Sequence, residues 1–141
     1  MARCSNGLRA KRVEPIFLTL DEILAIHRDQ IERYGGAYGV RDMGLLQSAV
    51  AMPPAAAYGQ YLHTDLCEMA AAYLFHIAQN PAFVDGNKRV AAVAASVFLQ
   101  MNDLELTASP NVFEKLVLAI ASSEKTKTDA TSFFRKHTKE L

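Results

Sequence analysis

Five consecutive residues of this chain carry groups that handle phosphate. Residues 85 to 89 read Asp85-Gly86-Asn87-Lys88-Arg89. The carboxylate could hold Mg2+ through a single ligand, and the glycine lets the backbone approach an anion closely. Lysine adds a point charge, and arginine adds a planar fork that matches phosphate oxygens. The run therefore predicts a site for a polyphosphate and Mg2+.

The segment after this run has the spacing of a helix, because apolar residues recur three and four positions apart at Val90, Val93, Ala94, Val97 and Met101. The run would then lie at a helix N-terminus, where unpaired N–H groups and the helix dipole attract anions. A plainer interpretation stays open. In it, the run is only a turn and N-cap, and its two cations lie on a solvated face.

The stretch from Phe83 to Arg89, Phe-Val-Asp-Gly-Asn-Lys-Arg, resembles the signature of the Fic family, His-x-Phe-x-Asp/Glu-Gly-Asn-Gly/Lys-Arg. Lysine before the arginine is similar to the death-on-curing (Doc) branch of that family. Ala92 stands where the nucleotidyl-transferring members usually carry a second arginine, which also favours Doc. The similarity extends over about residues 15 to 135.

The resemblance implies an all-α fold and the toxin of a bacterial toxin–antitoxin pair, which transfers phosphate from ATP to a hydroxyl of elongation factor Tu. In such sites a histidine accepts the proton of the attacking hydroxyl, and the acidic residue, here Asp85, places Mg2+. Gly86, Asn87, Lys88 and Arg89 would hold the phosphates together with Phe83, and Asp85, Lys88 and Arg89 would act in catalysis. The implied partner is an antitoxin that folds as a helix in a groove of the toxin.

One position departs from the family pattern, because Pro81 stands where the signature has its histidine. Proline has no titratable group, and general-base assistance is typically worth about two to four orders of magnitude in rate. We therefore expect this chain to bind nucleotide but to be inactive or severely impaired in transfer. A proline after a helix that ends near Asn80 is also an ordinary stop, which explains how the fold accepts it.

No other histidine has the spacing of the signature. His27 lies within the first expected helix, and His137 lies near the C-terminus. His76 is interpreted as a hydrogen-bonded helix residue. His63 lies in a loop that leads into the helix before the site, so it could approach the site in space.

Two further functions stay open beside the phosphotransferase. The first is a Fic-type transfer of AMP to a protein hydroxyl, against which Lys88 and Ala92 argue by family analogy. The second is a non-catalytic module that binds the antitoxin, since that role does not require the histidine.

Composition favours one globular domain. The chain has 141 residues, of which 50% are hydrophobic, and 15 basic residues balance 15 acidic ones. With this balance, no overall positive potential would attract the chain to nucleic acid or to an anionic membrane. No apolar stretch reaches the roughly 18 residues that a membrane-spanning helix needs. We expect a cytoplasmic helical domain over residues 14–141, preceded by a flexible arm or extension over residues 1–13.

Helical periodicity runs through almost the whole chain. Start and stop signals predict about six helices: one from Thr19 to Gly35, a short one between Asp42 and Pro53, two alanine-rich ones over 65–80 and 87–101, one opened by Ser109-Pro110, and one around 130–137. Small residues on several faces place the alanine-rich pair at the centre of the bundle, as a helical hairpin with the site at its tip. The glycine-rich loop 35–42 is either a plain connection or a flap beside the site.

Overall fold

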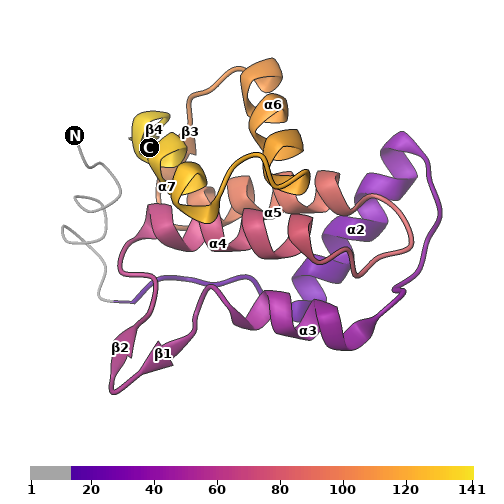
Figure 1. Ribbon diagram of the computed structural model, residues 1–141, viewed down its shortest axis with the longest axis horizontal. Helices are drawn as coiled ribbons and strands as arrows, with labels where there is room; N and C mark the ends of the chain where they lie inside the picture. Colours follow the sequence, from indigo (N-terminus) through magenta and orange to yellow (C-terminus); the bar gives the residue numbers. More distant parts are fainter. Residues whose placement is uncertain (1–13) are drawn as a thin grey trace.

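The computed structural model describes residues 14–141, and the expected arm, residues 1–13, lies outside the described part. The described chain contains six helices and two pairs of short strands (Figure 1). The predicted all-α class and helix number are thereby confirmed. The elements are α2 Leu20–Tyr34, α3 Met43–Ala51, β1 Ala56–Ala57, β2 Gln60–Tyr61, α4 Leu66–Gln79, α5 Asn87–Met101, β3 Leu104–Leu106, α6 Pro110–Ala121, α7 Lys127–Lys136 and β4 Thr138–Glu140.

Helix boundaries follow the capping signals closely. Thr19 and Glu22 form the reciprocal capping box at the start of α2, and Gly35, with φ 83°, ends that helix. Ser109 caps α6 with Pro110 in its first turn, as predicted. The carboxylate of Asp65 caps α4, because it accepts a hydrogen bond from the N–H of Glu68 in the first turn of that helix.

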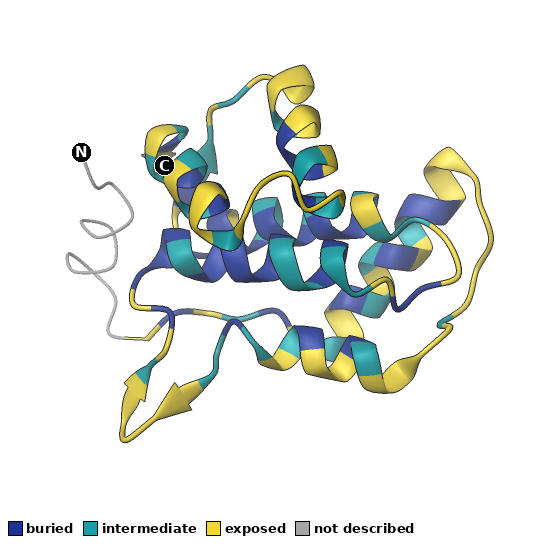
Figure 2. Cartoon of the chain, viewed as in Figure 1, coloured by how far each residue is buried: buried dark blue, intermediate teal, exposed yellow. Residues whose placement is uncertain are grey.

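The alanine-rich helices α4 and α5 form the centre of the bundle, as the sequence predicted. Figure 2 shows that buried residues recur along both helices, and α2, α3, α6 and α7 all pack against one or both of them. Each large apolar side chain removed from water contributes about 1.5–3 kcal/mol, so this pair dominates the core. The largest fully buried side chains include Tyr73, Phe83, Phe98, Phe134, Leu66, Met69, Leu74 and Leu99.

The extended segment before α2 is attached to the central pair by buried hydrogen bonds. The hydroxyl of Tyr73 accepts from the backbone N–H of Leu18 at 2.8 Å and donates to its carbonyl at 3.3 Å. The amide of Asn102 bonds in the same way to both backbone groups of Ile16. These bonds fix where α2 begins. They therefore also determine which residues of α2 reach the loop at the N-terminal end of α5.

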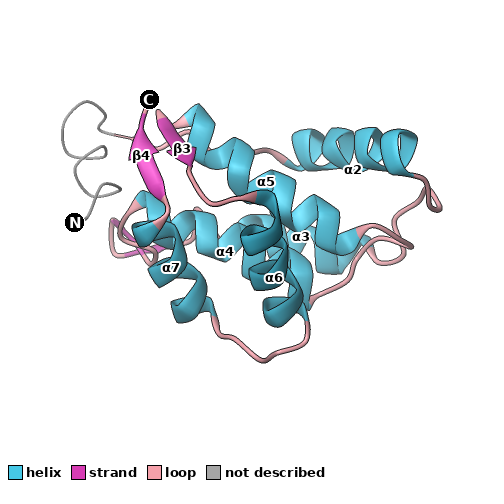
Figure 3. Cartoon of the chain, turned by 90° about the horizontal axis from the view of Figure 1, so that it is seen from above, coloured by secondary structure: helices cyan, strands magenta, loops and turns pink. Residues whose placement is uncertain are grey.

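The strands are only two or three residues long. β1 and β2 form an antiparallel hairpin at the lower left of Figure 1, and β3 pairs with β4 so that Leu106 faces Thr138. The second pair fastens the C-terminal end of the chain to the residues after α5, as Figure 3 shows from above. Within residues 14–141, no helix combines the length and the apolar content needed to cross a bilayer.

Polar side chains anchor α7 to α4 and to the loop before it. The Nζ of Lys127 lies 3.1 Å from Nε2 of His63 and 2.9 Å from Nε2 of His76. Toward the other end of α7, Arg135 forms an ion pair with Asp65 at 2.5 Å. Burial and the nearby cation of Lys127 lower the pKa of His76 to about 4, and the same causes lower the pKa of His63.

These histidines make the stability of the fold depend on pH. The pKa of His76 is about 4 in the folded chain against an ordinary 6.5, so the unfolded chain binds more protons between these values. The free energy of unfolding should therefore fall as the pH is lowered from about 6.5 to about 4, by about 1–2 kcal/mol after allowance for solvent screening. Urea unfolding of the wild type and His76→Gln at several pH values measures this, and the free energy of unfolding should fall more steeply toward pH 4 in the wild type than in His76→Gln. Parallel curves would contradict it.

Candidate functional site

Residues 80–86 join α4 to α5 and carry the predicted site at the tip of the central hairpin. Asn80, the C-cap of α4, has φ −118° and ψ 80°, in the extended range that a following proline imposes. It does not adopt the left-handed conformation that is common at helix ends. Gly86 precedes α5 with φ 80°, which favours glycine, and no side chain caps this helix. The first N–H groups of α5 therefore remain available for an anion, unlike those of an ordinary capped turn.

Asn87 holds this loop closed. Its Oδ1 accepts from the backbone N–H of Phe83 at 2.9 Å, and its Nδ2 donates to the carbonyl of Phe83 at 3.0 Å. Both backbone groups of one loop residue are thus paired with one side chain. The amide that we expected to hold phosphate therefore has a second task, which is to shape the loop.

His27 of α2 supports the loop from below. Its ring stacks on the ring of Phe83 with centroids 3.9 Å apart and planes 9° apart, and its Nε2 donates to the carbonyl of Asp85 at 2.9 Å. Both rings are buried. Phe83, expected among the binding residues, is thus buried under the loop. Its ring, stacked on His27, helps to fix the position of the loop backbone.

The loop 35–42 pairs with the site loop along its edge. Val40 and Phe83 form an isolated antiparallel bridge, and the N–H of Val84 donates to the carbonyl of Gly39 at 3.0 Å. The guanidinium of Arg41 donates to the carbonyl of Pro81, rather than pairing with a carboxylate. Loop 35–42 is thus more than a plain connection between helices, because it forms one wall of the site.

The carboxylate of Asp85 is held by backbone N–H groups from both loops. Oδ1 accepts from Gly86 at 2.9 Å, and Oδ2 accepts from Ala37 at 3.2 Å. Gly36 makes this approach possible, since a Cβ atom at that position would lie 2.7 Å from Oδ2. Asp85 remains exposed to solvent, so its oxygens keep lone pairs for a further ligand.

A cavity of about 410 Å3 lies against the site loop and brings most of the predicted residues together. Pro81 and Lys88 are exposed at this cavity. Its lining comprises Ala78, Pro81, Val84, Asp85, Gly86, Asn87, Lys88, Arg89 and Ala121.

Arg89 is placed differently from the other cation. Its guanidinium donates to the carbonyls of Gln30 at 3.2 Å and Gly35 at 3.0 Å, at the C-terminal end of α2. Its Cζ also lies 5.9 Å from the centroid of the Tyr34 ring. A cation is favourable at this end of a helix, where carbonyls are left without partners. Two of its five N–H groups are used in these two hydrogen bonds, which leaves the others for a ligand.

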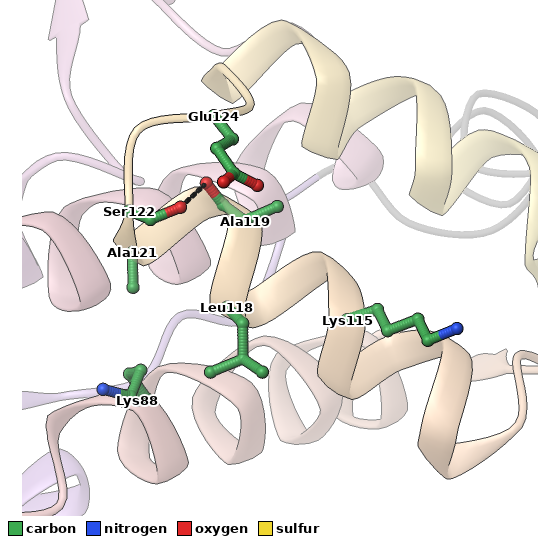
Figure 4. Close-up of a pocket in the computed structure, with 7 residues that line it drawn as sticks. All are labelled: Lys88, Lys115, Leu118, Ala119, Ala121, Ser122 and Glu124. Carbon is green, nitrogen blue, oxygen red and sulfur yellow. Dashed lines mark hydrogen bonds between the residues drawn. The ribbon is translucent and has the colours of Figure 1, made fainter.

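Lys88 also borders a second hollow, of about 580 Å3, between α5 and α6. Figure 4 shows Lys88 on α5 opposite Leu118 on α6, with Ser122 and Glu124 at the end of α6 and Lys115 pointing away. The hydroxyl of Ser122 donates to the carbonyl of Ala119 at 3.2 Å, which closes the end of α6. The side chain of Lys88 thus borders both this hollow and the cavity beside Asp85.

Comparison with known proteins agrees with this geometry. Residues 17–99 match the model of the Fic/DOC family. The toxin Doc of Mycolicibacterium smegmatis is 48% identical over 79 residues, 56% of this chain, and the chain spans about three fifths (61%) of the length of that relative. The protein kinase doc of Escherichia phage P1 is 35% identical over 105 residues, 74% of this chain and 81% of that relative. The chain belongs to the Fic/Doc family, in its Doc branch.

Sequence reasoning missed three residues that shape the site. His27 was placed in a helix without a role, although it is 58 positions from the carbonyl that it binds. Gly36 and Arg41 were considered only as members of the glycine-rich loop 35–42. No local pattern signals these contacts, because each depends on how α2 and loop 35–42 pack against the hairpin.

Replacing Asn87 by alanine should destabilise the fold, because both of the Phe83 backbone groups lose their partner. The expected loss is about 1–3 kcal/mol of unfolding free energy. Asn87→Asp should be intermediate, since it keeps the acceptor and loses the donor. Urea unfolding measures the effect, with Asn111→Ala on an exposed turn of α6 as the control. Equal losses in Asn87→Ala and Asn111→Ala would contradict the role of this residue.

Replacing Gly36 by alanine should displace the carboxylate of Asp85. The new Cβ would lie 2.7 Å from Oδ2, and φ is 118° there. Gly35→Ala is the matched control, because φ is 83° and nothing lies within 4 Å of its Cβ. The amide resonance of Gly86, which donates to Asp85, should move in Gly36→Ala and much less in Gly35→Ala. Equal movement would show that strain, and not contact with Asp85, is the cause.

Proposed function

We propose that this chain is the toxin of a bacterial toxin–antitoxin pair. Its ancestral activity is the transfer of the γ-phosphoryl group of ATP to a hydroxyl of elongation factor Tu, which blocks translation. Pro81 leaves the phosphate site in place but removes the base, so transfer is lost or severely impaired. The two relatives, a toxin and a protein kinase, support the class of activity.

The observation that carries this proposal is the loop around the 410 Å3 cavity. An uncapped helix N-terminus, a left-handed glycine and the exposed ammonium of Lys88 meet beside one carboxylate. Together they suit a polyphosphate, because backbone N–H groups and cations favour phosphate oxygens at a helix start. The loop is rigidly supported by Asn87 and His27, so little ordering is needed when an anion binds.

The donor set fits Mg2+ bound largely through phosphate and water. Residues 14–141 contain no group of three or more His, Cys, Asp or Glu side chains that could enclose a metal. Asp85 offers one carboxylate, and Mg2+ in phosphate sites is commonly held by one or two carboxylates with water and phosphate. When bound, Mg2+ would neutralise part of the phosphate charge. Asp85 itself is oriented by the N–H groups of Ala37 and Gly86.

Lys88 and Arg89 would bind the phosphate groups in different ways. Lys88 has an exposed ammonium that can follow the charge of a phosphate group. Arg89 keeps its hold on Gly35 while its other N–H groups bind phosphate oxygens, which fixes one orientation of the ligand.

Position 81 is suited to a base, although proline supplies none. Pro81 is exposed and borders the cavity that also holds Asp85 and Lys88. Arg41 binds the carbonyl of residue 81, a group that every amino acid provides. The loop should therefore keep its shape when residue 81 is histidine. A neutral imidazole there could accept the proton of an attacking hydroxyl.

A groove next to the site supports the antitoxin as partner. It has a volume of about 630 Å3, and α2, α5 and α6 line it. Tyr34 and Leu118 in this groove are 68% and 48% exposed, so large apolar surface is left for a partner. An amphipathic helix of the antitoxin fits such a groove with its apolar face inward. Because Lys88 and Arg89 line the groove too, its occupant would cover the phosphate site.

Restoring histidine at position 81 tests the proposal. Pro81→His should transfer label from γ-labelled ATP to purified elongation factor Tu about two to four orders of magnitude faster than the wild type. Expression of Pro81→His should also arrest growth where the wild type does not. Label from α-labelled ATP in its place would show AMP transfer.

The matched control is Pro81→His combined with Asp85→Asn, which keeps the base and removes the carboxylate for Mg2+. It should return to the wild-type rate. Calorimetry of the wild type with ATP and Mg2+ separates binding from transfer, and it should show binding. A Pro81→His chain that labels nothing and leaves growth unchanged would overturn the kinase proposal.

A further inference from the structure

The peptide that joins Asp85 to Gly86 has the geometry of the central peptide of a type II turn. Gly86 has φ 80° and ψ 14°, the values of the third residue of such a turn. Asp85 is not among the non-glycine residues with positive φ in the described chain, which excludes the type I′ turn. Type I and type II turns differ mainly in the orientation of this central peptide, so two orientations are sterically accessible here.

The orientation of this peptide decides which of its groups lies beside the anion cavity. A trans peptide is planar, so its C=O and N–H point in opposite directions. The N–H of Gly86 donates to Oδ1 of Asp85, a residue that lines the cavity, while the carbonyl of Asp85 faces α2. Reversal of the peptide would place the carbonyl oxygen where the N–H now lies. That oxygen would repel a phosphate group, and the carboxylate would lose one of its two N–H partners.

The glycine at position 86 leaves this orientation unprotected. Glycine adopts either sign of φ at little cost, so the residue that lets the backbone approach an anion also permits the reversal. A side chain cannot take its place, because a Cβ atom there would lie 3.3 Å from Cδ1 of Ile31 and 3.4 Å from Nη2 of Arg89, at a φ of 80°. The orientation therefore has to be set by a group outside the turn.

His27 of α2 is such a group. Its Nε2 lies 2.9 Å from the carbonyl oxygen of Asp85, and a carbonyl can only accept, so Nε2 carries the proton. The side chain is buried, with 5% of the residue exposed, so bulk water does not compete for this bond. His27 is not among the residues that line the cavity beside Asp85. It can therefore act on an anion only through the backbone of the loop.

The imidazole of His27 is itself fixed in direction. Its ring lies parallel to that of Phe83, with 3.9 Å between centroids and 9° between planes. Asn87 in turn holds both backbone groups of Phe83. The donor of His27 is thus directed at a single carbonyl by contacts that do not include that carbonyl.

We propose that His27 is a positioning residue for the phosphate site. By donating to the carbonyl of Asp85, it keeps the Asp85–Gly86 peptide in the orientation that binds anions, and it thereby sets the affinity of the loop for phosphate. This inference rests on the phosphate site proposed above. It does not depend on phosphoryl transfer, so it applies to the chain that carries Pro81.

Two variants separate the hydrogen bond of His27 from its packing. His27→Phe keeps an aromatic ring against Phe83 but cannot donate to the carbonyl. His27→Gln keeps an N–H donor at a similar reach but loses the stacked ring. A purely structural role would lower stability and phosphate binding in the same order. Positioning through the hydrogen bond predicts opposite orders, in which His27→Phe is the more stable variant and His27→Gln binds the anion more tightly.

NMR of the chain without ligand measures the orientation of the peptide. The distance from Hα of Asp85 to the amide proton of Gly86 depends on ψ of Asp85, and it is short in a type II turn and longer in a type I turn. The NOE between these protons should be strong in the wild type and in His27→Gln, and weaker in His27→Phe. An equally strong NOE in His27→Phe would overturn the proposal. Nucleotide plays no part in this measurement.

Calorimetry with ATP and Mg2+ measures the consequence for binding, and urea unfolding gives the order of stability. The affinity of His27→Phe should fall about three- to tenfold, as expected for one neutral hydrogen bond, and that of His27→Gln should fall less. Wild-type affinity in His27→Phe, despite a weaker NOE, would refute the link between peptide orientation and anion binding. Absence of ATP binding by the wild type, with a strong NOE, would instead overturn the phosphate site itself.

Discussion

The close contact between α4 and α5 is the constraint on which the rest of the structure depends. Their facing surfaces are largely alanine, and Ala70, Ala71, Ala91, Ala94 and Ala95 are fully buried. Small side chains bring the two backbones close, and a close-packed interior leaves little freedom to shift them. The ends of both helices are therefore fixed, and so is the span of the loop between them. The four outer helices only need to cover this pair.

The loop at the tip is shaped by contacts that leave its reactive groups free. Asn87 closes it from within, His27 supports it from α2, and loop 35–42 pairs with its edge. None of these contacts uses the ammonium of Lys88 or the side chain of residue 81. The shape of the site and its chemistry are thus carried by different atoms. Because of this separation, the side chain of residue 81 can change without removing any of the contacts that shape the loop.

The sequence was informative wherever the signal is local. The capping box at Thr19, the Ser109-Pro110 start of α6 and the glycine at position 35 act within one turn of their helices, so their types fix the boundaries. The candidate site was also predictable as a run of residues, because its members are consecutive. The contacts that hold this run in place were not predictable from the sequence. The bond from His27 to Asp85 and the approach of Gly36 to the same carboxylate depend on how distant segments pack, and short patterns do not encode that.

Arg89 has a consequence that reaches beyond its own contacts. Its guanidinium lines the cavity beside Asp85 and also donates a hydrogen bond to the carbonyl of Gly35, at the point where α2 passes into the loop whose N–H groups hold Asp85. An anion that displaced the Arg89 side chain would also disturb the end of α2. An anion that bound while the hydrogen bond to Gly35 stayed intact would restrict the motion of that end. If the cavity binds an anion as proposed, its occupancy and the order of residues 35–42 would be thermodynamically linked, and by reciprocity a protein bound to this segment would alter the affinity of the cavity for the anion.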